Sequence, residues 1–156
     1  MDNIHFSIST SRLEDYFITD IFVNGIDLRS IIAKIEQQQL QPIGYAQLSG
    51  AYEGISPFLA FHLHDHFNGK TVNEYLYYDF CFTLFNYMYS GVPGDHTLTC
   101  KIEITKDKVR WYDFKNFSKI YTGKIDYGEL SFSFSAESYR AAIENLKKNE
   151  IQNMYV

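Results

Sequence analysis

The sequence has few of the features that most directly indicate a catalytic or disulfide-stabilised protein. Only two cysteines and three prolines occur among its 156 residues. The cysteines, Cys81 and Cys100, form no Cys-x-x-Cys pair, and two such residues do not build a disulfide framework. Both lie in apolar runs, where a thiol behaves as a small hydrophobic side chain and thiolate formation is opposed. The chain also lacks a Gly-x-Ser-x-Gly elbow and a phosphate-binding loop.

Long hydrophobic runs and an excess of positive charge are missing as well. No stretch approaches the roughly 18 uninterrupted apolar residues of a membrane span, and the first residues lack the pattern of a secretory signal. We therefore expect a cytoplasmic protein with no membrane partner. With 14 basic against 19 acidic side chains, the net charge is −5. Because clustered Lys and Arg bind phosphate backbones, this balance argues against nucleic acid as a partner.

Aromatic residues are abundant instead, with 13 Tyr and 13 Phe. A tyrosine ring is apolar while its hydroxyl prefers water or a polar partner, so these residues suit core edges and interfaces. Two interpretations stay open at this point. The rings build the core of a sheet, or some of them form a recognition surface for another protein.

Periodicity predicts both strands and helices. Alternation of apolar and polar residues predicts strands over 4–10, 16–23, 75–90, 97–104 and 109–114, and a further one through Phe132 and Phe134. The dipeptide Asn24-Gly25 favours a tight turn. Apolar spacing of three and four predicts helices over 27–39 and 136–148, with Asp27 and Ser135 as their caps. Residues 44–70 are expected to form an ordered loop with one short element.

These elements predict an α+β fold in one domain. We expect residues 1–148 to form an antiparallel sheet of five to six strands with the two helices packed on it. The strand over 75–90 is apolar on both faces, so it is expected to be central and covered on both sides. Residues 149–156 are expected to be a frayed C-terminal tail.

A histidine-rich segment is the main candidate for metal chemistry. His62, His64 and His66 lie within five residues. On a strand all three would share a face, and on a helix His62 and His66 would do so, with Leu63 at the position of the catalytic glutamate of zinc proteases. A solvated loop edge explains the same residues without a metal. We therefore expect no cofactor and no catalytic residues, and keep a metal-dependent enzyme or metal-binding protein using these histidines as an alternative.

Tyrosines next to carboxylates are the candidates for binding another protein. Exposed aromatic rings with scattered acidic groups are typical of protein-binding surfaces. The expected partner-binding residues are Tyr52, Glu53, Tyr87, Tyr89, Asp95, Tyr112 and Asp113.

A series of short motifs runs along most of the chain. They are Val23-Asn24-Gly25-Ile26-Asp27-Leu28, Gly50-Ala51-Tyr52-Glu53-Gly54-Ile55, Val109-x-Trp111-x-Asp113-Phe114, Tyr127-x-x-Leu130-x-Phe132-x-Phe134 and Tyr139-x-x-Ala142-Ile143. Their order resembles a widespread family of small, uncharacterised bacterial proteins. Many members carry a cysteine cluster around the central hairpin, whereas this chain has Cys81 and Cys100 alone. The resemblance implies a bacterial source and no established activity.

These observations favour a non-enzymatic, protein-binding role. The most concrete hypothesis is an immunity protein that neutralises a nuclease-type toxin by binding it directly. An acidic surface would complement the basic groove of such a toxin domain. A structural or regulatory homo-oligomer that associates through an aromatic face is the second alternative, and the sequence leaves the oligomeric state open.

Overall fold

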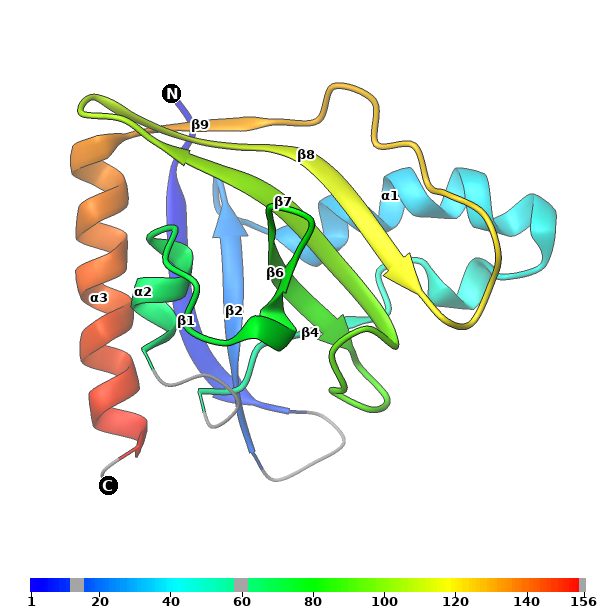
Figure 1. Cartoon of the computed structure of the whole chain (residues 1–156), viewed down its shortest axis with the longest axis horizontal. Coiled ribbons are helices and arrows are strands. Elements are labelled where there is room, and N and C mark those ends of the chain that lie inside the picture. The colour runs from blue at the N-terminus through cyan, green and yellow to red at the C-terminus, as the bar shows by residue number, and fades with distance from the viewer. Residues whose placement is uncertain (12–15, 58–61, 155–156) are drawn as a thin grey trace.

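Two antiparallel sheets with helices packed on them form the framework of the computed structural model, which describes residues 1–11, 16–57 and 62–154 (Figure 1). The smaller sheet has the order β1-β2-β3, and the larger has the order β4-β6-β7-β8-β9, with β5 paired to β6. The strands are β1 (Ile4–Thr10), β2 (Phe17–Val23), β3 (Ile26–Asp27), β4 (Tyr52–Gly54), β5 (Tyr77–Tyr78), β6 (Cys81–Tyr87), β7 (His96–Ile104), β8 (Lys108–Ser118) and β9 (Phe132–Ser135). The α+β class and the sheet of five to six strands are therefore confirmed, and β1 and β2 belong to a second, smaller sheet.

Three α-helices and three short 3₁₀ segments complete the described chain. They are α1 (Leu28–Leu40), α2 (Leu63–Phe67), α3 (Ala136–Met154), η1 (Gln41–Ile43), η2 (Ala46–Leu48) and η3 (Glu74–Leu76). Figure 1 shows α3 along β1 on one side of the molecule, with α2 beside it, and α1 on the opposite side. None of the helices in the described ranges combines the length and apolar character needed to cross a membrane.

The local signals for helix starts and turns are confirmed. The Asp27 carboxylate accepts a hydrogen bond from the Arg29 backbone N–H at 2.9 Å, as an N-cap does. Ser135 Oγ accepts from the Ser138 N–H at 3.1 Å and caps α3 in the same way. At the β2–β3 turn Asn24 and Gly25 both have positive φ, of 54° and 77°. The two helix caps and the turn involve residues that are at most three positions apart, which is why a local sequence pattern predicts them.

The expected strand over 75–90 is wrong as a single element. It divides into η3, β5 and β6, because Asp79 and Phe80 adopt left-handed φ values of 49° and 65° and reverse the chain. Tyr77 and Phe82 then face each other across the hairpin. Asp-Phe lacks the glycine that normally marks such a turn, and the apolar alternation continues through it.

Other boundaries also differ from the sequence prediction. The strand expected over 109–114 runs from Lys108 to Ser118. It contains a bulge, because its register with β7 shifts between Thr99 and Lys101, and Asp113 has a φ of 55°. Among the described residues of the 44–70 region there are three short elements where one was expected, namely η2, β4 and α2, and positions 58–61 lie outside the described residues. The last helix continues to Met154, beyond its expected end at residue 148.

The core joins both sheets and two helices around one tryptophan. Trp111 on β8 is fully buried, stacks on Phe67 of α2 at 6.1 Å between ring centroids, and meets Phe134 of β9 edge-on at 5.7 Å. Its indole N–H donates to the Tyr139 hydroxyl of α3 at 3.1 Å, which in turn donates to the Phe67 carbonyl. Phe6 of β1 lies 6.3 Å from the same ring. The aromatic residues of the C-terminal motifs thus serve mainly as packing.

Candidate functional site

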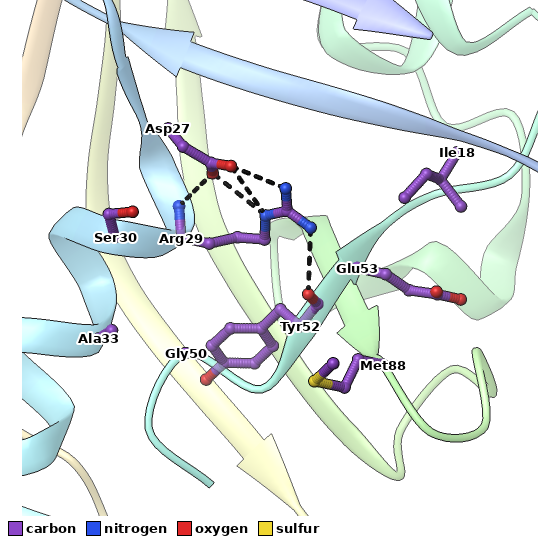
Figure 2. A pocket seen from close by; sticks show the side chains of 9 residues that line it. All are labelled: Ile18, Asp27, Arg29, Ser30, Ala33, Gly50, Tyr52, Glu53 and Met88. Atoms are coloured by element: carbon purple, nitrogen blue, oxygen red, sulfur yellow. Dashed lines mark hydrogen bonds and ion pairs between the residues drawn. The ribbon is translucent and has the colours of Figure 1, made fainter. Parts of the chain in front are cut away.

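A pocket of about 280 Å³ lies between α1 and β4. Figure 2 shows Asp27 and Arg29 at one side of it and Tyr52, Glu53 and Met88 at the other. Gly50 also lines the pocket, where a side chain would collide with α1, since a Cβ there would lie 2.6 Å from the Ala33 Cβ. The start of the helix and the β4 strand therefore form its walls.

Arg29, the positively charged residue of this pocket, already interacts with other groups of the chain. Arg29 Nη2 lies 2.7 Å from Asp27 Oδ2 and 3.3 Å from Asp20 Oδ1. Its Nη1 donates to the Tyr52 carbonyl at 3.4 Å (Figure 2). The hydrogen bond to Asp27 raises the pKa of Arg29 although partial burial opposes this. The arrangement is that of a clamp between α1 and β4 rather than of a ligand site.

Replacing Arg29 by alanine is expected to lower the free energy of unfolding by about 2 kcal/mol, the cost of losing hydrogen bonds between charged groups. The reason is that the Asp20 side chain, 9% exposed, loses the guanidinium that faces it. Urea titration of the variant measures this loss. The control is Lys34→Ala on the exposed side of α1, and an equal effect at both positions would contradict the clamp.

Tyr52 and Glu53 are buried, so their prediction as partner-binding residues is wrong. They are 2% and 5% exposed. The cause is tertiary: β4 lies against the backbone of β2, where a Cβ on Gly54 would sit 1.6 Å from the Thr19 carbonyl oxygen. The Glu53 carboxylate already has partners within the chain, since it accepts hydrogen bonds from Ser11 Oγ at 2.8 Å and from the Tyr16 hydroxyl.

A second buried carboxylate, Glu36 on α1, ties the helix to distant segments. One of its oxygens accepts from the hydroxyls of Tyr52 and Tyr127, each at 2.5 Å, and the other accepts from the Gly50 N–H at 2.9 Å. Glu36 is fully buried. Loss of hydration raises its pKa, while these three hydrogen bonds oppose the rise. The Tyr52 hydroxyl, which sequence analysis assigned to a surface, thus helps to satisfy an interior carboxyl group.

Tyr87, Tyr89 and Asp95 are brought together at the loop that follows β6. The Tyr87 ring is half-buried, meets His96 edge-on at 5.6 Å and meets Tyr89 at 5.3 Å. Tyr89 is 62% exposed. The Asp95 carboxylate accepts from Ser90 Oγ at 2.9 Å, which fixes the loop, and remains partly exposed. This part of the predicted set is accessible to a partner.

Tyr112 and Asp113 lie elsewhere, on the outer face of β8, in basic surroundings. Asp113 pairs with Lys101 at 3.0 Å and with Lys115 at 3.7 Å, and the hydrogen bond from Lys101 lowers the pKa of its carboxyl. The Arg110 guanidinium covers the Tyr112 ring at 4.4 Å. The predicted residues therefore do not form one surface, and this pair is not an acidic patch.

Sequence analysis missed two exposed rings, Tyr75 and Phe80. They are 66% and 73% exposed. Within the described ranges, the exposed Tyr and Phe side chains are these two and Tyr89, and all lie between positions 75 and 89. Phe80 lies at the β5–β6 turn and Tyr89 beyond the other end of β6, and the loop after β6 reaches β5, because a Cβ on Gly94 would lie 3.5 Å from the Tyr78 hydroxyl. No local sequence signal marked this exposure, because the turn at Asp79-Phe80 lacks the glycine that is typical of such a hairpin turn.

The three histidines of the 62–66 segment separate into two environments. His66 is buried, its Nε2–H donates to the Thr83 carbonyl at 2.8 Å, and burial lowers its pKa to about 4. It cannot share a ligand site with the others, so its assignment to the metal alternative is wrong. His62 and His64 instead lie with Asp65, and one ligand atom from each falls within 4.8 Å of the others.

Comparison with known proteins adds no relative from which an activity could be carried over. The resemblance to a family of small bacterial proteins therefore stays a prediction. No protein-family model, curated protein or solved structure matches this chain.

Proposed function

We propose that this protein acts by binding another protein, through a surface that we call the recognition segment, residues 74–95. The observation that carries the proposal is the gathering of the exposed rings of Tyr75, Phe80 and Tyr89 in this one segment. Large aromatic side chains are the most frequent energetic anchors of protein interfaces. Isolated exposed apolar residues are ordinary, but three large exposed rings within one short stretch of chain favour an interaction site.

The backbone at Phe80 supports the same proposal. A non-glycine residue in the left-handed region costs roughly 1–2 kcal/mol, and Phe80 has a φ of 65° while its ring is 73% exposed. Its ring contact within the chain is with Tyr77, at 6.4 Å between centroids. A strained backbone that holds an apolar ring in water gains little for folding, which favours a role in binding.

Charge indicates the kind of partner. The recognition segment contains Glu74, Asp79 and Asp95 and neither lysine nor arginine. Glu74 and Asp79 are exposed. Opposite charge across an interface accelerates association and selects the partner. We therefore propose a basic partner, and most concretely a toxin domain whose active site this protein covers as an immunity protein.

The test uses the purified product of the reading frame next to the gene, titrated with this protein by calorimetry and assayed for toxicity in its presence. We expect a one-to-one complex, loss of toxin activity on mixing, and an association rate that falls as salt is raised. Absence of both binding and inhibition would contradict the immunity role. Mass that grows with concentration in light scattering would instead favour the homo-oligomer.

Replacing Phe80 by glycine is expected to separate binding from stability. Affinity for the partner should fall by about ten-fold or more, since an anchor ring is lost. Stability should rise by up to about 1 kcal/mol, because Asp-Gly suits the left-handed turn that Asp-Phe adopts under strain. Calorimetry and urea titration of one preparation measure both.

Two further variants test whether the binding surface lies in the recognition segment. Tyr89→Ala should also weaken binding, whereas Ile151→Ala should not, because that exposed side chain lies on α3, outside the recognition segment. Equal affinity of Phe80→Gly, Tyr89→Ala and wild type would refute the proposed surface.

A further inference from the structure

We propose that His62, His64 and Asp65 form a zinc-binding site whose geometry is set by Glu150 of α3. Each of the three residues offers one ligand atom, and these atoms lie within 4.8 Å of one another. Two imidazoles and a carboxylate are ligands that zinc accepts. The inference goes beyond partner binding and does not depend on it.

The orientation of His64 is the strongest support. Its Nδ1–H donates to Glu150 Oε1 at 3.0 Å, so the lone pair of the neutral ring lies on Nε2. That nitrogen faces Asp65 Oδ2 at 3.8 Å. A histidine that binds zinc nearly always donates its other ring N–H to a carboxylate or carbonyl, which fixes the tautomer and the ring.

Glu150 is itself held in place for this role. Its side chain is 4% exposed, and its two oxygens also accept the backbone N–H groups of Leu63 and His64, at 3.0 and 2.8 Å. The carboxylate thereby fixes the start of α2 as well as the His64 ring. The first turn of α2, which carries the ligands, is thus braced by a separate helix, as the rigid geometry of a metal site requires.

His62 and Asp65 complete the set from either side of His64. His62 adopts a left-handed φ of 62°, and its exposed ring meets the His64 ring edge-on at 5.4 Å between centroids. Asp65 Oδ1 lies 3.5 Å from Lys70 Nζ, which leaves Oδ2 turned toward the histidines. Lys70 is the competing cation that zinc has to displace in part.

The distances suit a small tetrahedral ion. Ligands at about 2.0–2.2 Å from zinc lie roughly 3.3 Å from each other, against the 3.8 Å between His64 Nε2 and Asp65 Oδ2. Rotation of the exposed His62 ring and of the partly buried Asp65 carboxylate closes this difference and the separation of up to 4.8 Å within the set. Three protein ligands leave the fourth position to water, which is the open coordination of a zinc ion able to act on a further group.

The experiment uses full-length protein without an affinity tag, stripped with a chelator and titrated with Zn²⁺ against a chromophoric competitor. We expect one equivalent of zinc, and tetrahedral absorption bands when Co²⁺ replaces it. His64→Ala and His62→Asn should each weaken zinc binding by about 10- to 100-fold, and Glu150→Gln by at least about ten-fold. Asparagine at position 62 tolerates the left-handed backbone, so that variant should keep its fold.

Three controls make the result decisive. His5→Ala removes an exposed histidine on β1 and His66→Gln the buried one, and neither should change zinc affinity. Lys70→Ala, at a side chain that is 66% exposed, should strengthen binding by removing the competing cation. Zinc affinity that is the same in wild type, His62→Asn and His64→Ala, or absence of a one-to-one complex, overturns the proposal.

Discussion

Replacing Trp111 by alanine is expected to lower the free energy of unfolding by about 3–5 kcal/mol. The ring is fully buried and contacts β1, α2, β9 and α3 at once. Its removal leaves a cavity bounded by elements of both sheets, which cannot all collapse into it. The loss of the hydrogen bond to Tyr139 adds to this cost. The effect should appear as a lower urea midpoint and a melting temperature reduced by roughly 10 °C.

The adjacent residue supplies the matched control. Tyr112 points to the other face of β8, where it is half-buried beneath Arg110. Tyr112→Ala removes a large ring from the same strand and should cost less than about 1 kcal/mol. Similar losses for the two variants would mean that strand β8, rather than the tryptophan cluster, limits stability.

The second large effect is expected at Glu36. Glu36→Ala should destabilise the protein by about 3 kcal/mol, because two tyrosine hydroxyls and the Gly50 N–H lose their buried acceptor. The relief of a buried charge offsets part of this cost. Gln37→Ala, at the exposed neighbouring position on α1, should be nearly neutral. Chemical denaturation at pH 7 measures both.

The pH dependence of this effect has a definite sign. Burial raises the folded-state pKa of Glu36 above its ordinary value of 4.5. Between the two values the folded state binds more proton than the unfolded state, so the contribution of Glu36 falls as pH rises from about 4.5 through the folded-state pKa. Glu36→Gln cannot ionise. The stability of wild type relative to this variant should therefore decrease over that window, and an increase would show that the charged form is the favoured one.

The candidate recognition residues show where sequence reasoning was sufficient and where it failed. Tyr89 and Asp95 lie at a loop rich in turn-forming residues, and such loops remain on the surface. Tyr52 has the same composition around it, yet it is buried because β4 packs between β2 and β6. Exposure of a tyrosine depends on which segment covers it, and no local pattern carries that information.

The histidine segment shows the same distinction. Sequence spacing grouped His62, His64 and His66, but a short helix turns His66 inward to the Thr83 carbonyl. Asp65, instead of His66, lies beside His62 and His64. Glu150, which accepts a hydrogen bond from His64, stands 85 positions beyond Asp65 in the sequence. A carboxylate so remote in sequence cannot be assigned to a histidine before the helix that carries it is docked.

The sequence by itself determined the α+β class, the helix caps at Asp27 and Ser135, the Asn24-Gly25 turn and most strand positions. These features arise from contacts within a few residues and from alternation between water and core. Only the tertiary structure decided the division into two sheets, the reversal at Asp79-Phe80, the burial of Tyr52 and Glu53, and the pairing of His64 with Glu150. Each depends on segments distant along the chain excluding water from the same place, which the order of residues does not specify locally.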